Sequence, residues 1–216
     1  MKKTAIIILS LICINTFAQT ETALSFRNTY LNFGLNLSNG IFKTTANQPE
    51  VKYQPRLGFR LGLESDFYSI NDKLSLETGL SLILSQYKID ELDYQYSSFH
   101  IGTHLLTKYE LNDFNFGIGP YINFGLFGKQ KLPSGNTVNF YSGNDQQSEA
   151  PFKRLDFGID FRLNYSLKWN LIDEVYISYR LGLSNIENIE APSGIDQSFK
   201  LRHFSLGVRS NLSKIL

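Results

Sequence analysis

A period of two in residues 111–127 constrains this chain more than any other feature. From Phe114 to Leu126 every second residue is apolar, and the residues between them are small or polar. This alternation indicates a β-strand with one apolar face and one polar face. The segment is about twice as long as a typical globular strand, which suits a tilted strand that crosses a membrane.

The same alternation recurs along the chain and predicts eight strands. They are residues 30–38, 56–67, 74–85, 99–109, 111–127, 155–167, 175–183 and 203–212. Short connections (68–73, 110–113, 168–174) alternate with long ones (39–55, 86–98, 128–154, 184–202). The chain is therefore predicted to be all-β: an eight-stranded antiparallel up-and-down transmembrane β-barrel with short periplasmic turns, long extracellular loops and both ends in the periplasm.

Residues 1–18 have the pattern of a cleaved signal peptide, which leaves residues 19–216 as one barrel domain. Lys2 and Lys3 precede an apolar core that is too short to span a bilayer, and small residues lead to a cleavage site after Ala18. A buried N-terminal helix is the alternative. Cleavage would remove Cys13, the only cysteine, and with it any disulfide or thiolate metal site. It would also leave the formal charge, +1 for the whole chain, near zero, which argues against a nucleic-acid partner.

The polar faces of the predicted strands carry eleven of the sixteen glycines and balanced charges of both signs. The interior of an eight-stranded barrel is just wide enough to be filled by side chains. We therefore predict a salt-bridged polar plug rather than a charge-selective pore. Its predicted members are Arg56, Arg60, Glu64, Glu77, His100, His104, Lys108, Asp156, Asp160, Arg162, Arg180 and Arg209. Outward aromatics near the short turns, at Phe67, Tyr109, Phe114 and Trp169, predict an aromatic girdle.

Metal and catalytic sites are not predicted. His100 and His104 would lie about 13 Å apart along one strand, too far to share an ion, and His203 lies on another strand. Asp156 and Asp160 have the same separation and are more simply ion-pair partners. The enzyme alternative, a lipid- or peptide-modifying site at the outer rim, would use Ser97, Ser98, His100 and the acids of residues 89–93, but nothing in the sequence pairs a nucleophile with a base.

Two long loops contain aromatic residues that predict an extracellular contact surface. Phe140 and Tyr141 lie in the middle of the polar loop 128–154, and Tyr94 and Tyr96 lie in the loop 86–98. Exposed aromatic side chains in a polar loop are plausible anchors for a protein partner. The alternative is a solvated, mobile loop.

The fourth and fifth predicted strands, SSFHIGTHLLTKYELNDFNFGIGPYINFGL, resemble the small outer-membrane β-barrel proteins of Bacteroidetes-type bacteria, which include PorT-like proteins. The matching features are the strand that ends at Lys108 and Tyr109 and the Gly119-Pro120-Tyr121 signature; Gly102 stands where that family often has proline. The resemblance implies an outer-membrane barrel and an accessory role in protein secretion or surface assembly. The last residues depart from the aromatic ending common in such barrels.

Together these features predict a non-enzymatic structural or binding protein in the outer membrane of a Gram-negative cell. Its expected partners are outer-membrane lipid and a protein that contacts the loops, without a cofactor, and it would act as a monomeric barrel or as a subunit of a complex. An enzyme and a small-solute channel are the functional alternatives. A soluble lipocalin-like barrel, with the apolar face inward, is the alternative fold.

Overall fold

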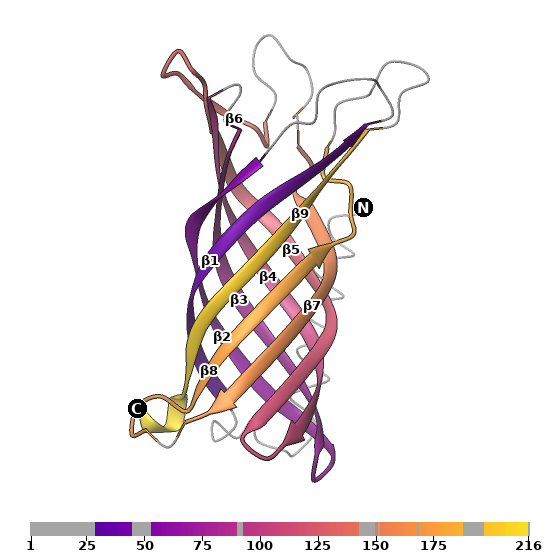
Figure 1. Cartoon of the computed structure of the whole chain (residues 1–216), viewed down its shortest axis with the longest axis vertical. Helices are drawn as coiled ribbons and strands as arrows, with labels where there is room; N and C mark the ends of the chain where they lie inside the picture. The colour runs from indigo at the N-terminus through magenta and orange to yellow at the C-terminus, as the bar shows by residue number, and fades with distance from the viewer. Residues whose placement is uncertain are drawn as a thin grey trace, which may run out of the picture.

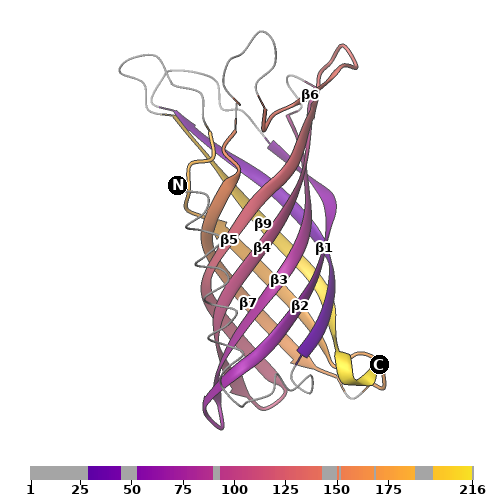
Figure 2. The ribbon, with the colours of Figure 1, turned by 180° about the vertical axis from the view of Figure 1, so that it is seen from behind.

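The chain forms a closed barrel of tilted strands, seen from two sides in Figures 1 and 2. The computed structural model describes residues 29–44, 53–89, 93–142, 150, 152–167, 169–187 and 197–215, so the predicted signal peptide lies outside the described residues. The strands are β1 (Thr29–Thr44), β2 (Tyr53–Asn71), β3 (Leu74–Ile89), β4 (Tyr94–Leu111), β5 (Phe114–Lys131), β6 (Thr137–Asn139), β7 (Leu155–Ser166), β8 (Glu174–Gly182) and β9 (Gln197–Asn211).

The strands pair in the order β4-β3-β2-β1-β9-β8-β7-β5, and a further β4–β5 pairing closes the ring of eight. Every pairing is antiparallel. Strand β6 is a short addition that pairs with β5 beyond the ring. The predicted eight-stranded up-and-down barrel is confirmed. No helix in the described part of the chain is long and apolar enough to span a bilayer.

The two ends of the barrel differ. Two-residue turns join β2 to β3 and β4 to β5 at one end, here called the turn end. Strand β1 begins and β9 ends at this end, where the short helix η2 (Leu212–Lys214) also lies (Figure 1). The opposite end, called the loop end, carries β6 and the connections that follow β1, β3, β5 and β8.

The apolar faces of the strands point outward and form an exposed apolar belt around the barrel. Leu57, Ile118 and Leu206, for example, are 57%, 51% and 52% exposed. The predicted girdle residues Phe67, Tyr109, Phe114 and Trp169 are all exposed near the turn end. A lipocalin-like barrel would bury this face, so the exposures contradict the alternative fold.

The strands continue past their predicted limits at the loop end. Strand β3 reaches Ile89 and β4 begins at Tyr94, so most of the predicted loop 86–98 is strand. In the same way, β1 extends to Thr44 and β9 begins at Gln197. The backbone ladder continues here, but the outward residues are polar because they lie beyond the apolar belt. The expected pattern, apolar outside and polar inside, is lost at that point.

Candidate functional site: a closed lumen and an aromatic lid

A network of buried ion pairs fills the middle of the lumen. Its centre is the carboxylate pair Glu64 of β2 and Glu77 of β3, and both side chains are fully buried. Arg162 of β7 binds both through Nη1, which donates to Glu64 Oε2 at 2.7 Å and to Glu77 Oε1 at 2.8 Å. Arg209 of β9 also contacts both, with Nη2 2.6 Å from Glu77 Oε2 and Nε 3.1 Å from Glu64 Oε2. Such charge-assisted hydrogen bonds are short and strong.

These pairs cross the full width of the barrel. In the ring of eight, β7 and β2 are four strands apart in either direction, so the Arg162–Glu64 pair joins opposite walls. Arg60 of β2 also reaches across the lumen toward β7, where its Nη1 lies 3.8 Å from Asp160. Its Nη2 lies 3.1 Å from Glu64 on its own strand. The name lumen network is used below for Arg60, Glu64, Glu77, Asp160, Arg162 and Arg209.

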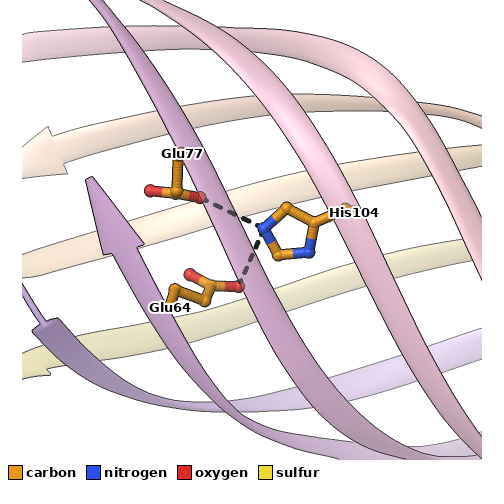
Figure 3. Close-up of side chains that lie close together, drawn as sticks. All are labelled: Glu64, Glu77 and His104. Atoms are coloured by element: carbon orange, nitrogen blue, oxygen red, sulfur yellow. Dashed lines mark ion pairs between the residues drawn. The ribbon is translucent and has the colours of Figure 1, made fainter. Parts of the chain in front are cut away.

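His104 lies beside the two central carboxylates and raises the question of a metal site (Figure 3). Its Nε2 is 3.4 Å from Glu77 Oε1 and 3.8 Å from Glu64 Oε1, and one ligand atom from each residue fits within 4.8 Å. However, the same Glu77 oxygen accepts from Arg162, and the same Glu64 oxygen accepts from Arg60. A cation would have to displace two arginines, so this donor set favours ion pairs over metal binding.

Other predicted lumen residues extend the polar filling along the barrel. Lys108 binds Asp66 at 2.8 Å and Glu77 at 3.3 Å toward the turn end. Arg180 of β8 donates to Asp160 Oδ2 at 2.8 Å. Asp156 accepts from Ser184 and Asn123 nearer the loop end. Glu174, which accepts a hydrogen bond from Arg209 at 2.6 Å, was not predicted to be a lumen residue. Glu174 lies just before the predicted strand 175–183, where alternation does not show which residues point inward.

Arg56 corrects the predicted set. It is exposed, and its Nη1 donates to Gln95 Oε1 at 2.7 Å instead of to a lumen acid. The β2–β3 register shifts between Arg56 and Phe59, which places Arg56 opposite Gln86. A β-bulge of this kind redirects the side chain, and alternation alone does not reveal it.

Above the lumen network lies a layer of buried histidines and serines. His203 Nδ1 is 2.9 Å from Ser38 Oγ, and His100 Nε2 is 2.8 Å from Ser98 Oγ. Both imidazoles are at most 2% exposed. His100 and His104 lie in different layers of the lumen, as their predicted separation along one strand requires. His104 contacts the central carboxylates, whereas His100 contacts Ser98 in the serine layer.

The prediction of an exposed aromatic contact loop is wrong. Phe140, Tyr141 and Tyr96 are only 2%, 6% and 8% exposed, and Tyr94 is partly buried against them. They belong to an inward-facing cluster at the loop end, here called the aromatic lid. Its buried members are Tyr87, Ile89, Tyr96, Phe140, Tyr141, Ile186, Phe199 and Leu201. The aromatic rings lower their free energy by leaving water, so the chain after β5 folds back over the lumen instead of extending outward.

Glycines in β5 leave room for the lid. A Cβ atom at Gly128 would overlap the Phe140 ring, and one at Gly125 would overlap the Tyr141 ring. Arg154 holds the returning chain against the barrel wall through Nη1, which donates to the carbonyl oxygens of Gly125 and Leu126 at 3.0 and 2.9 Å. The lid is therefore packed against the wall.

The lid tyrosines should resist ionisation. Burial, with a smaller effect from Tyr94, raises the pKa of Tyr96 to about 12 from an ordinary value of 10.0. Because the folded lid favours the neutral phenol, the contribution of Tyr96 to lid stability is complete below pH 10 and is lost as the pH rises toward 12. An alkaline titration of tyrosinate absorbance should therefore show a late step that Tyr96→Phe reduces. Ionisation of all the tyrosines in one step near pH 10 would contradict this packing.

A closed antiparallel barrel with an apolar outer belt and an ion-paired lumen defines an outer-membrane β-barrel protein. The chain belongs to the outer membrane protein beta-barrel domain family, whose profile matches residues 17–188. Its location is the outer membrane of a Gram-negative cell, so the loop end is extracellular and the turn end is periplasmic. No curated protein matches this chain.

Solved structures of other outer-membrane proteins are similar in fold. Neisserial surface protein A is 14% identical with a TM-score of 0.50, over 85% of this chain and 97% of that chain. Ail of Yersinia pestis, solved with the heparin analogue sucrose octasulfate, is 10% identical with a TM-score of 0.44, over 85% and 97%. The outer membrane enzyme PagL is 12% identical with a TM-score of 0.41, over 82% and 99%.

Proposed function

We propose that this protein is a non-enzymatic structural or binding component of the outer membrane, with a closed lumen. The observation that carries the proposal is the Arg162–Glu64 pair, which joins opposite walls of the barrel at 2.7 Å. By its resemblance to PorT-like proteins, its finer role is accessory to protein secretion or surface assembly, through a protein that binds its extracellular end.

The lumen network argues against a solute channel. The five buried cations Arg60, Lys108, Arg162, Arg180 and Arg209 each lie within 4 Å of a lumen carboxylate. Removing one partner of a buried pair leaves an uncompensated charge, so the pairs resist opening. The aromatic lid adds an apolar layer on the extracellular side.

The serine–histidine layer argues against catalysis at the outer rim. Within the described residues, His203 Nε2 and His100 Nδ1 have no hydrogen-bond partner, so no carboxylate orients either imidazole as a nucleophile–base–acid arrangement requires. Both serine–histidine pairs also lie inside the barrel, beneath the lid.

Planar-bilayer recordings test the closed lumen. The purified protein should insert without stepwise conductance, because side chains fill the cross-section at the lumen network and again at the lid. An open-pore barrel of similar strand number, inserted in the same membrane, controls for insertion. Stable single-channel currents from the unmodified protein would refute the closed-lumen proposal and favour the channel.

The binding role is tested by gentle extraction of the native protein from outer membranes, followed by identification of what co-elutes. Secretion or surface-assembly components in stoichiometric amounts would support the accessory role. A protein that elutes alone and cleaves lipid or peptide, with loss of activity in Ser98→Ala, would instead support the enzyme.

A further inference from the structure

The outer surface of the barrel carries exposed cations just beyond the extracellular edge of the apolar belt. Lys129 and Lys131 of β5 are exposed, as is Arg56 of β2. In the β4–β5 register Lys129 lies opposite Ser97, and Lys131 lies opposite Gln95. We define these five residues, Arg56, Gln95, Ser97, Lys129 and Lys131, as the rim patch.

The rim patch is organised around Gln95. The Arg56 guanidinium donates to Gln95 Oε1 at 2.7 Å, and Lys131 faces the same residue from the other side. Lys129 and Lys131 point the same way, about 7 Å apart along the strand. The described acid that precedes β4, Asp93, is paired with Lys88 at 3.0 Å.

Directly below the rim patch is a row of phenylalanines. The Phe59 and Phe99 rings meet edge to face with centroids 6.5 Å apart, and the Phe99 and Phe127 rings stack at 5.0 Å. Phe127 is 53% exposed. Aromatic side chains are enriched at the boundary between acyl chains and headgroups. This row therefore places the cations at the height of the lipid headgroups.

The two rims of the barrel differ in charge. At the periplasmic end the described residues expose three acids, Asp72, Glu110 and Asp113, and two cations, Lys73 and Lys214. The outward strand faces at the extracellular end carry further cations on β1 and β9, at Lys43, Lys200 and Arg202. Among the described residues on the outward strand faces, the cations therefore lie on the side that faces the outer leaflet.

We propose that the rim patch binds the phosphate groups of an anionic glycolipid in the outer leaflet, whose acyl chains lie against the phenylalanine row. Clustered Lys and Arg at a membrane surface attract anionic headgroups, and Arg binds phosphate through two parallel hydrogen bonds. A lipid fits better than a soluble anion because cations and acyl-binding rings occupy adjacent rows of one surface. This inference does not depend on the proposed binding or secretion role.

The test uses the full barrel in phosphatidylethanolamine nanodiscs with added phosphorylated lipid A, and measures retained lipid A by native mass spectrometry. The triple variant Arg56→Gln/Lys129→Gln/Lys131→Gln should retain lipid A with an affinity reduced by about tenfold or more. The control Lys73→Gln/Lys214→Gln removes cations from the periplasmic rim and should leave the affinity within about twofold. The urea midpoint of the triple variant should match that of the unmodified protein, because its side chains are exposed.

Two further arms identify the ligand. Dephosphorylated lipid A should bind the unmodified protein as weakly as phosphorylated lipid A binds the triple variant. Equal retention of the two lipids, or unchanged retention by the triple variant, would overturn the proposal. Inorganic phosphate alone should give the same thermal shift in both proteins, and saturable phosphate binding lost only in the triple variant would overturn the assignment to lipid.

Discussion

Arg162→Met should lower the free energy of unfolding by about 3–5 kcal/mol, the cost of removing one partner from a buried ion pair. The Arg162 guanidinium contacts Glu64, Glu77 and Asp160, and its loss leaves excess negative charge in the middle of the barrel. Arg209 still contacts the first two acids, but it is already bound to Glu174. Methionine keeps much of the side-chain volume, so the effect measures charge more than packing.

The measurement is urea unfolding in lipid vesicles, followed by the fluorescence of Trp169, the only tryptophan. Arg56→Met is the matched control, because Arg56 was assigned to the same network from the sequence but lies on the exposed surface. It should change stability by no more than about 0.5 kcal/mol. Equal destabilisation by both variants would show that the lumen pairs contribute no more than a surface arginine.

A second-site variant separates charge from cavity formation. Glu64→Gln added to Arg162→Met removes one of the carboxylates that Arg162 neutralises. If excess charge causes the loss, the double variant should recover about 1 kcal/mol or more relative to Arg162→Met. Further loss, additive with the first, would assign the effect to packing.

The barrel was predictable from sequence because lipid imposes a strict rule on each strand. Every outward residue within the apolar belt must be apolar, while the lumen accepts glycine and charge, so the period of two is visible without a structure. Leu57, Leu61 and Leu63, which point outward, alternate with Gly58 and Arg60, which point inward. The same rule placed Glu64, Glu77 and Arg162 in the lumen but did not pair them. Their pairing depends on the stagger of opposite strands across the barrel, which alternation does not encode.

The aromatic lid was missed because the pattern reverses where the strands leave the lipid. On β3, Tyr87 and Ile89 point inward, whereas Gln86 and Lys88 point outward. On β9, Phe199 and Leu201 point inward between outward Lys200 and Arg202. The segments are still alternating, but with polar residues outside and apolar residues inside. That reversal is visible in the sequence. It marks the residues at which the strands leave the apolar belt and begin to line the aromatic lid.

Gly119→Ala should destabilise the barrel by about 3 kcal/mol, whereas Gly117→Ala on the same face of β5 should cost at most about 1 kcal/mol. A Cβ at Gly119 would overlap the Leu105 carbonyl oxygen and lie 2.9 Å from its carbon, so the obstacle is the backbone of β4. A Cβ at Gly117 would meet only side-chain atoms at ordinary contact distances: Leu106 Cδ1 at 3.4 Å, Arg162 Cβ at 3.6 Å and Lys108 Cγ at 3.7 Å. The two glycines are identical in sequence pattern, yet only one lies where neighbouring strands approach too closely for a side chain.

The same urea titration compares the two glycine variants, with heat-modified mobility on gels as a check that each one folds. If Gly119→Ala does not fold, adding Leu105→Gly should not rescue it, because the clash is with the main-chain oxygen of residue 105 and not with its side chain. Equal stability of Gly117→Ala and Gly119→Ala would mean that β4 and β5 separate at little cost. In that case the inward glycines would serve lumen filling alone, and the close approach of the two strands would contribute nothing to the stability of the barrel.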